Sequence, residues 1–278
     1  MNLFQNAQTS NPTPTTSLLA IPLLFALLAA LIYIRKDYHA FLSLGPGGIP
    51  STPTGYIHQC LLRPFALRDP LIPPPIPATL TLPPQSGFLP TTMKPTTAIS
   101  KPFPTRPGPR PTVKGLAPQR QTTQQGTKTS YDVLSLRLRE LVHADASTHA
   151  LYTATSCFEK HSTGIFCHPD GPFSRDRDED GPVVVRAPSS CPCEVCHAHP
   201  SDGSLHLSLH PADMAVVLER GWGQRHPLAV EGGLCWGFVR TVPVDFVMVY
   251  APRDEAEMEV VLEIVRAAIA WVGGKALI

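Results

Sequence analysis

The distribution of proline limits the fold of this chain more than any other feature of its sequence. The chain holds 32 prolines in 278 residues, and from Pro70 to Pro111 they recur every few residues with Thr and Ser between them. Because proline lacks a backbone N–H and fixes φ, such a segment is unfavourable for both helices and sheets. We therefore predict an extended linker over residues 70–107, ahead of a folded domain at residues 108–274.

An uncharged apolar run lies before this linker. It begins at Leu18 and ends at Ile34, and as a helix it would span about 25 Å, near the short end for a bilayer core. Arg35 and Lys36 follow the run, whereas a signal peptide carries its basic residues ahead of it. The pattern predicts three N-terminal segments: a disordered tail at residues 1–17, a transmembrane anchor at 18–36 and a juxtamembrane segment at 37–69.

The distribution of charged residues predicts where the C-terminal domain lies and which partners the chain does not bind. The basic residues that follow the apolar run place the C-terminal domain in the cytosol, and we expect an internal membrane. The chain has 23 Lys and Arg against 22 Asp and Glu, without a basic patch, which argues against a nucleic-acid partner. Its seven cysteines are an odd number in a long chain, which favours free thiols or ligands over a disulfide framework.

Helices and strands alternate irregularly after residue 110, so we predict an α+β domain. Helical periodicity marks residues 131–143, with Ser130 as the cap, and residues 254–272, where Asp254 and Glu257 resemble a capping box. Strands are predicted at 157–167, 183–186 and 246–250, the last of them central. A hairpin around Ser-Asp-Gly at 201–203 is predicted to lead into a helix at 211–220.

The densest polar cluster of the sequence lies on this hairpin. His197 and His199 fall on one face of a strand, and His206 reaches that face in one of the two possible registers. Three imidazoles are a plausible metal site, with Glu194 as a fourth ligand or as a partner of a ligand. Two alternatives remain open: hydrogen-bonded histidines that bind no metal, and a structural zinc ion on Cys191, Cys193, Cys196 and a histidine.

The stretch Gly221-Trp222-Gly223-Gln224-Arg225-His226-Pro227-Leu228-Ala229 follows the predicted helix. Two glycines around a tryptophan indicate a sharp turn or a close backbone approach. Arg225 offers a fixed cation beside His226, which can gain or lose a proton near neutral pH. The chain contains no Gly-x-Gly-x-x-Gly after a strand, Walker loop, Gly-x-Ser-x-Gly or His-Glu-x-x-His, so nucleotide chemistry, serine hydrolysis and zinc proteolysis have no support.

The chain resembles the fungal luciferase family over most of residues 18–272 outside the linker. The likeness rests on the nine residues from Gly221 and on Val249-Tyr250-Ala251-Pro252-Arg253-Asp254-Glu255. Shorter matches are His197-x-His199, Leu205-His206-Leu207, Gly108-Pro109-Arg110-Pro111, Pro118-Gln119-Arg120-Gln121, Phe158-Glu159-Lys160-His161, Arg35-Lys36-Asp37-Tyr38, Phe41-Leu42 and Gly55-Tyr56-Ile57. The proline-rich linker and the cysteine group at 191–196 are departures from the family pattern.

The resemblance implies a membrane-anchored enzyme that uses molecular oxygen on a hydroxylated α-pyrone, which is 3-hydroxyhispidin in luminous fungi. No organic cofactor is implied, and molecular oxygen is the co-substrate; a metal ion is compatible with the histidine cluster. Because luciferase-like domains also occur where no light is made, luminescence is not expected. The alternative is a membrane-tethered, non-catalytic domain that binds a small molecule or a metal.

Residue chemistry suggests a role for each site residue. We expect His226 to act as the base that ionises the pyrone enol, Arg225 to hold the enolate and Trp222 to stack on the flat substrate. Further candidates for contact with the aromatic substrate are His197, His199, His206, Tyr250 and Arg253.

Overall fold

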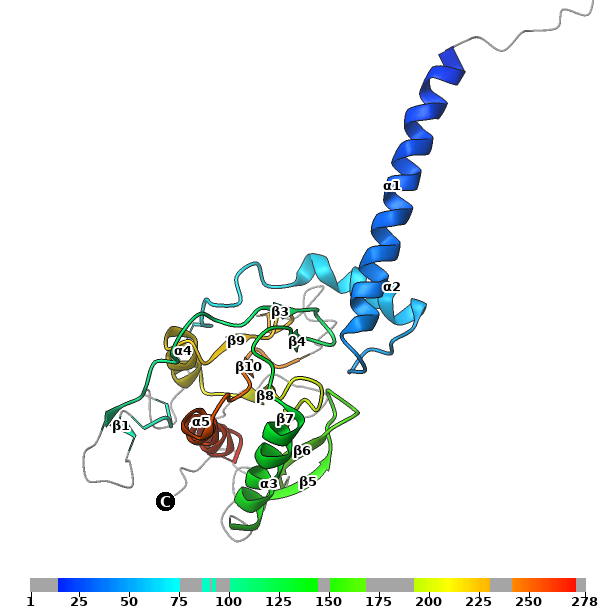
Figure 1. Cartoon of the computed structure of the whole chain (residues 1–278). Coiled ribbons are helices and arrows are strands. Elements are labelled where there is room, and N and C mark those ends of the chain that lie inside the picture. Colours follow the sequence, from blue (N-terminus) through cyan, green and yellow to red (C-terminus); the bar gives the residue numbers. More distant parts are fainter. Residues whose placement is uncertain are drawn as a thin grey trace, which may run out of the picture. The chain divides into compact units, whose positions relative to one another are not determined.

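The structure is a computed structural model. It describes residues 15–75, 87–90, 92–93, 101–144, 151–168, 193–230 and 242–273. Contacts within the chain divide it into two units, Met1–Ser43 and Leu44–Ile278. The first unit contains a single long helix, α1 (Thr15–Ser43), and the second contains every other element (Figure 1). Of the expected disordered tail at residues 1–17, residues 1–14 lie outside the described residues, and residues 15–17 belong to α1 instead. The strand expected at residues 183–186 also lies outside the described residues.

The prediction of a membrane-spanning segment finds no support in the structure. Among the described residues, no helix combines the length and the apolar character that crossing a membrane requires. The apolar run does form a helix, but α1 continues past Ile34 through the charged residues Arg35, Lys36 and Asp37 as far as Ser43.

A six-stranded sheet with antiparallel pairing organises the second unit, in agreement with the predicted α+β class. Its strand order is β5-β6-β7-β8-β10-β9, so the predicted strand at 246–250 is interior but next to an edge strand. The strands are β5 (Leu151–Thr155), β6 (Thr163–Cys167), β7 (Glu194–Ala198), β8 (Leu205–Ser208), β9 (Gly223–Arg225) and β10 (Phe246–Val249). The predicted hairpin is confirmed as β7 and β8, whereas the strand predicted at 157–167 begins only at Thr163.

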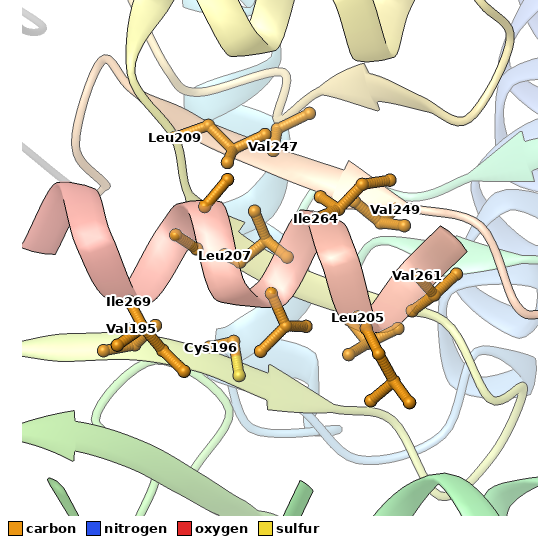
Figure 2. Packing of buried hydrophobic residues seen from close by; sticks show 14 of the residues in the cluster. Val195, Cys196, Leu205, Leu207, Leu209, Val247, Val249, Val261, Ile264 and Ile269 are labelled. Carbon is orange, nitrogen blue, oxygen red and sulfur yellow. The ribbon is translucent and has the colours of Figure 1, made fainter. Parts of the chain in front are cut away.

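Helix α5 (Glu255–Gly273) covers one face of this sheet and packs on β7, β8 and α3 (Lys128–Ala144). Figure 2 shows Leu205, Leu207 and Leu209 directed at this helix. The helix presents to these leucines a continuous apolar stripe that includes Val261, Ile264 and Ile269, all 0% exposed. Each such side chain contributes about 1.5–3 kcal/mol on burial, so this layer is the main core of the unit.

The starts of both helices differ slightly from the prediction. Thr127 rather than Ser130 caps α3, because the Thr127 hydroxyl accepts the backbone N–H of Ser130. Asp254 caps α5 by accepting the N–H of Glu257, as expected. The Glu257 carboxylate, however, accepts the N–H of Arg253 instead of closing a capping box.

The proline-rich segment is not a free linker where it is described. The backbone N–H groups of Phe88 and Leu89 donate to the Asp213 carboxylate at 2.8–2.9 Å. Phe103 is 5% exposed, and two short strands, β1 (Thr92–Met93) and β2 (Lys101–Pro102), pair with each other. Prolines prevent long ladders, but they leave isolated N–H groups and apolar side chains that dock on the folded domain.

Other short elements complete the second unit. They are α2 (Pro53–Leu62), the 3-10 helix η1 (Arg63–Phe65), β3 (Val113–Lys114), β4 (Arg120–Gln121) and α4 (Pro211–Glu219). The predicted helix at 211–220 is thus confirmed as α4.

The Gly-Trp-Gly sequence ends α4 and begins β9. Gly221 has φ +82°, its N–H donates to the carbonyl of Leu218, and the N–H of Trp222 donates to the carbonyl of Val217. This is a Schellman motif, in which glycine takes the left-handed position that other residues adopt at a cost. Gly223 has a different reason: a Cβ there would lie 2.4 Å from the Met248 carbonyl oxygen. Both expectations for this stretch, a turn and a close approach, are therefore confirmed.

Candidate functional site

Four histidines gather on the sheet face opposite α5. The register pairs His197 of β7 with His206 of β8, so both side chains point to the same side. The ring centroids of His199 and His206 are 4.6 Å apart, and those of His206 and His226 are 5.1 Å apart. All four rings are 0–5% exposed. The predicted face of three imidazoles, His197, His199 and His206, is confirmed with the register that it required, and His226 lies against His206.

A β-bulge brings an acid onto the same face. Strict alternation would place Glu194 and His197, three residues apart, on opposite sides of β7. Ile165 pairs with Cys196 but Phe166 pairs with Glu194, so Val195 is an extra residue in β7. Val195 and Cys196 consequently both enter the core beneath α5, as Figure 2 shows. Glu194 is returned to the histidine face, where its Oε1 lies 2.6 Å from His197 Nδ1.

The outward nitrogens of His197 and His199 both face acceptors. The Glu194 side chain also accepts hydrogen bonds from the Ser156 hydroxyl and the Cys157 N–H, and in its contact with His197 the Nδ1–H of the ring is the donor. His199 Nδ1 lies 2.9 Å from Ser204 Oγ, which itself donates to Asp202. The Ser204 proton is thus committed to Asp202, and His199 Nδ1 must be the donor in its own bond.

His206 follows the same pattern with an amide. Its Nε2 lies 2.8 Å from Gln119 Oε1, and with this orientation of the amide Nε2 is the protonated nitrogen. The nitrogens left without a proton are His197 Nε2, His199 Nε2 and His206 Nδ1, and these face one another: His206 Nδ1 is 3.0 Å from His199 Nε2 and 3.4 Å from His197 Nε2. Three lone pairs therefore converge inside the cluster.

His226 has the opposite arrangement. Its Nδ1 accepts the backbone N–H of Leu228 at 3.1 Å, so the proton of the neutral ring lies on Nε2. Among the described residues, no hydrogen bond to this Nε2 is found. The geometry favours His226 as a hydrogen-bond donor to a bound anion, in contrast to the base role expected from its residue type.

Burial favours the neutral form of His199, His206 and His226. It lowers the pKa of His206 well below its ordinary value, with the neighbouring imidazoles adding to the effect, and it lowers the pKa of His226 to about 3. Burial likewise lowers the pKa of His199. For Asp202, burial acts to raise the pKa, but the hydrogen bonds from His199 and Ser204 prevail and hold it below the usual range.

Two other predicted site residues are placed away from the imidazoles. Arg225 pairs with Val247 in β10 and thus points to the face opposite His226, and its guanidinium donates to the carbonyls of Ile72 and Ala229. Trp222 belongs to the hydrophobic core, where its Nε1 donates to the Pro104 carbonyl at 2.7 Å. Both side chains fix the chain around the site, and neither lies where it would contact a ligand of the histidines.

The remaining candidates, Tyr250 and Arg253, flank the start of α5. The Tyr250 hydroxyl donates to Gln224 at 3.1 Å, and Arg253 forms an ion pair with Glu257 and a hydrogen bond to the Pro107 carbonyl. Within the described residues, neither contacts any of the four imidazoles.

The cysteines do not join this group. Cys196 points into the apolar core, where burial raises the pKa of its thiol. Cys157 is disulfide-bonded, so the expectation of unpaired cysteines is wrong for this residue, and Cys191 lies outside the described residues. In the part of the chain that the structure describes, the only set of three metal-ligand side chains is His197, His199 and His206, whose ligand atoms all lie within 4.8 Å of one another.

Several site residues were missed from the sequence. Gln119 reaches the cluster from 87 positions upstream, and Phe246 lies against three of its rings, with centroid distances of 5.1–6.1 Å. Ser156 contacts His197 of β7, and Asp202 contacts His199 in the turn that follows β7. Gln119 lies in one of the short family matches, Asp202 looked like an ordinary turn residue, and no local signal marks Ser156 or Phe246, because their partners are distant in the sequence.

Comparison with known proteins supports the family resemblance. The family model for the Luciferase domain matches residues 192–268, which contain all four histidines. A luciferase of Armillaria mellea is 32% identical over 88% of this chain and 84% of its own length. A luciferase of Neonothopanus nambi is 33% identical, over 86% and 80% of the two chains. No solved structure gives a significant match. These relatives, which match most of this chain and most of their own length, show that the chain belongs to the fungal luciferase family.

Proposed function

We propose that this protein catalyses the oxygen-dependent oxidation of a hydroxylated α-pyrone or a similar enolic aromatic molecule. The observation that carries the proposal is the set of four buried imidazoles on one sheet face, with the Nε2–H of His226 left for a ligand. Membership of a family whose relatives are luciferases supports a small-molecule substrate and an oxidative reaction.

The reaction balances without an added reductant. Molecular oxygen adds to the electron-rich pyrone, and the resulting peroxide loses one carbon dioxide to leave the oxidised product. One O2 is consumed and one CO2 is released for each substrate molecule. The protein has to stabilise the ionised enol and to exclude water from the peroxide.

The described residues suit these two tasks. A neutral His226 that donates from Nε2 stabilises an enolate without adding a full charge, and its pKa of about 3 keeps it neutral across the physiological range. Phe246 and Phe158, whose ring centroids are 4.8 Å apart, supply apolar surface beside the imidazoles. Apolar walls lower the local dielectric constant, which strengthens each hydrogen bond to the developing anion.

Oxygen uptake and carbon dioxide release by the purified full chain test this function. With a hydroxylated α-pyrone we expect equal amounts of O2 consumed and CO2 released, and a fall in turnover of about 10²–10³-fold in His226→Phe, the usual effect of losing one oxyanion donor. His210→Asn is the matched control, because His210 is a buried histidine that caps α4 and Asn is a good cap. Binding of the pyrone without oxygen uptake would contradict the proposal and support a non-catalytic binding domain.

A further inference from the structure

The convergence of three unprotonated nitrogens calls for a positive charge between them. His199 Nε2 and His206 Nδ1 are 3.0 Å apart, and neither brings a proton to this contact, because Ser204 and Gln119 accept the ring protons on the other side. Two facing lone pairs at this distance repel each other. A proton shared between the rings or a metal ion would turn the repulsion into attraction.

We propose that His197, His199 and His206 bind one divalent first-row transition-metal ion, through His197 Nε2, His199 Nε2 and His206 Nδ1. Imidazole nitrogens bound to one tetrahedral ion at about 2.0–2.1 Å lie about 3.3 Å from each other. The two contacts of His206 Nδ1 measure 3.0 and 3.4 Å. Imidazole ligands suit zinc, copper, iron and nickel, and a three-histidine set leaves a coordination position open.

The surrounding residues have the arrangement of supporting partners in a metal site. Metal-binding histidines commonly donate their other ring N–H to a carboxylate, a carbonyl or a hydroxyl group, which fixes the ring and raises its basicity. Here His197 donates to Glu194, His199 to Ser204 with Asp202 behind it, and His206 to Gln119. All three ligands are thus oriented with the correct nitrogen inward, although they come from β7, the following turn and β8.

The acidic side chains around the cluster are buried with it. Arg120 and Glu159 form a buried ion pair that is neutral as a unit. Glu194 and Asp202 are 2% and 1% exposed, and among the described residues each forms its ion-pair contact with a histidine alone. A divalent cation bound by the three imidazoles would therefore lie next to two buried acidic side chains.

Metal uptake by the full chain, measured without pyrone, tests this site separately from the oxidation proposed above. After treatment with a chelator we expect the chain to take up one Zn²⁺ or one Co²⁺, with a dissociation constant below about 1 µM. The Co²⁺ form should show d–d absorption without the near-ultraviolet band of a thiolate ligand, which separates this site from the cysteines. His199→Asn should abolish uptake, and His210→Asn should leave it unchanged.

Variants of the supporting residues keep the proposal testable if a ligand variant fails to fold. Glu194→Gln keeps the shape but removes the carboxylate, and we expect it to weaken Zn²⁺ binding about 10–100-fold. Gln119→Glu retains an acceptor for His206 and should bind at least as tightly as the wild type. Absence of uptake by the wild type, uptake unaffected by Glu194→Gln, or a thiolate band that Cys193→Ser removes would each overturn the proposal.

Discussion

The two faces of strand β8 differ in what holds them together. Leu205 and Leu207, both fully buried, point at α5, where packing with many apolar side chains stabilises them. His206 and Ser208, which alternate with them, are equally buried on the other face, 4% and 1% exposed. There His206 contacts Gln119 through Nε2 and the neighbouring imidazoles through Nδ1. An apolar core tolerates substitution by other apolar side chains of similar volume, whereas a buried polar network is disturbed by the loss of any partner. We therefore attribute the polar face to function and the apolar face to stability.

The largest effect is expected on the apolar face. Leu207→Ala removes a side chain that is 0% exposed between β8 and α5, and such a cavity lowers the free energy of unfolding by about 2–5 kcal/mol. Chemical denaturation measures this loss. Leu136→Ala, at a residue that is 50% exposed on α3, is the control and should change the value by no more than about 0.5 kcal/mol. Equal effects of the two substitutions would refute the assignment of the core.

Asp213 is a buried acidic residue beside the apolar core, and it makes the stability of the fold depend on pH. Burial raises its pKa to about 6 from an unfolded value of 3.8, although hydrogen bonds from Phe88 and Leu89 oppose the shift. Between pH 4 and pH 6 the folded chain therefore holds a proton that the unfolded chain has lost. This contribution to the free energy of unfolding is full below pH 4 and falls by about 3 kcal/mol as the pH rises through 6.

The comparison with Asp213→Asn isolates this contribution. The free energy of unfolding of the wild type, minus that of the variant, should decrease from pH 4 to pH 7. A difference that stays constant or increases over this range would show that the carboxylate is ionised in the fold throughout.

A smaller effect is expected from the polar face. Ser204→Ala leaves both His199 Nδ1 and Asp202 Oδ1 with one partner fewer, which costs about 1–3 kcal/mol of unfolding free energy. Thermal or chemical denaturation checks the value. An unchanged free energy of unfolding would mean that the Ser204 hydroxyl does not form hydrogen bonds with both His199 and Asp202.

The smallest effect should come from the surface. Arg137 of α3 forms an ion pair with Glu259 of α5, and the two side chains are 36% and 45% exposed. Exposed pairs contribute about 0–1 kcal/mol, so Arg137→Ala should lower the free energy of unfolding by at most about 1 kcal/mol, and less in high salt. A loss as large as that of Leu207→Ala would indicate that the contact between α3 and α5 has been underestimated.

The sequence predicts which face of a strand a residue occupies, and where a helix ends, better than it predicts which residues contact each other. The alternation of apolar and polar residues at 205–209 correctly assigns the side chains to the two faces of β8, and Gly221 marks the end of α4. Glu194 was predicted beside the histidines, and its contact with His197 confirms this. The bulge that places it there, with Val195 as the extra residue in β7, could not be predicted from alternation. Arg225 was expected beside His226, but adjacent residues of an extended chain point to opposite sides.

Long-range contacts account for most of the remaining differences. The contact of Gln119 with His206 and that of Asp213 with Phe88 join positions 87 and 125 residues apart. Such contacts depend on the complete fold, which local periodicity does not report. For the same reason, the proline-rich segment appeared to be a linker although its described parts pack on the domain.

Oxygen uptake by His206→Phe, normalised to folded protein, tests the central claim most directly. His206 lies between the other imidazoles and contacts His197, His199 and His226, and phenylalanine preserves its planar shape without any nitrogen. If the polar face of the sheet performs the chemistry, uptake with a hydroxylated α-pyrone should fall by at least about 10²-fold while the variant remains folded. Uptake equal to that of the wild type would contradict the account, because the buried histidines would then serve the fold alone.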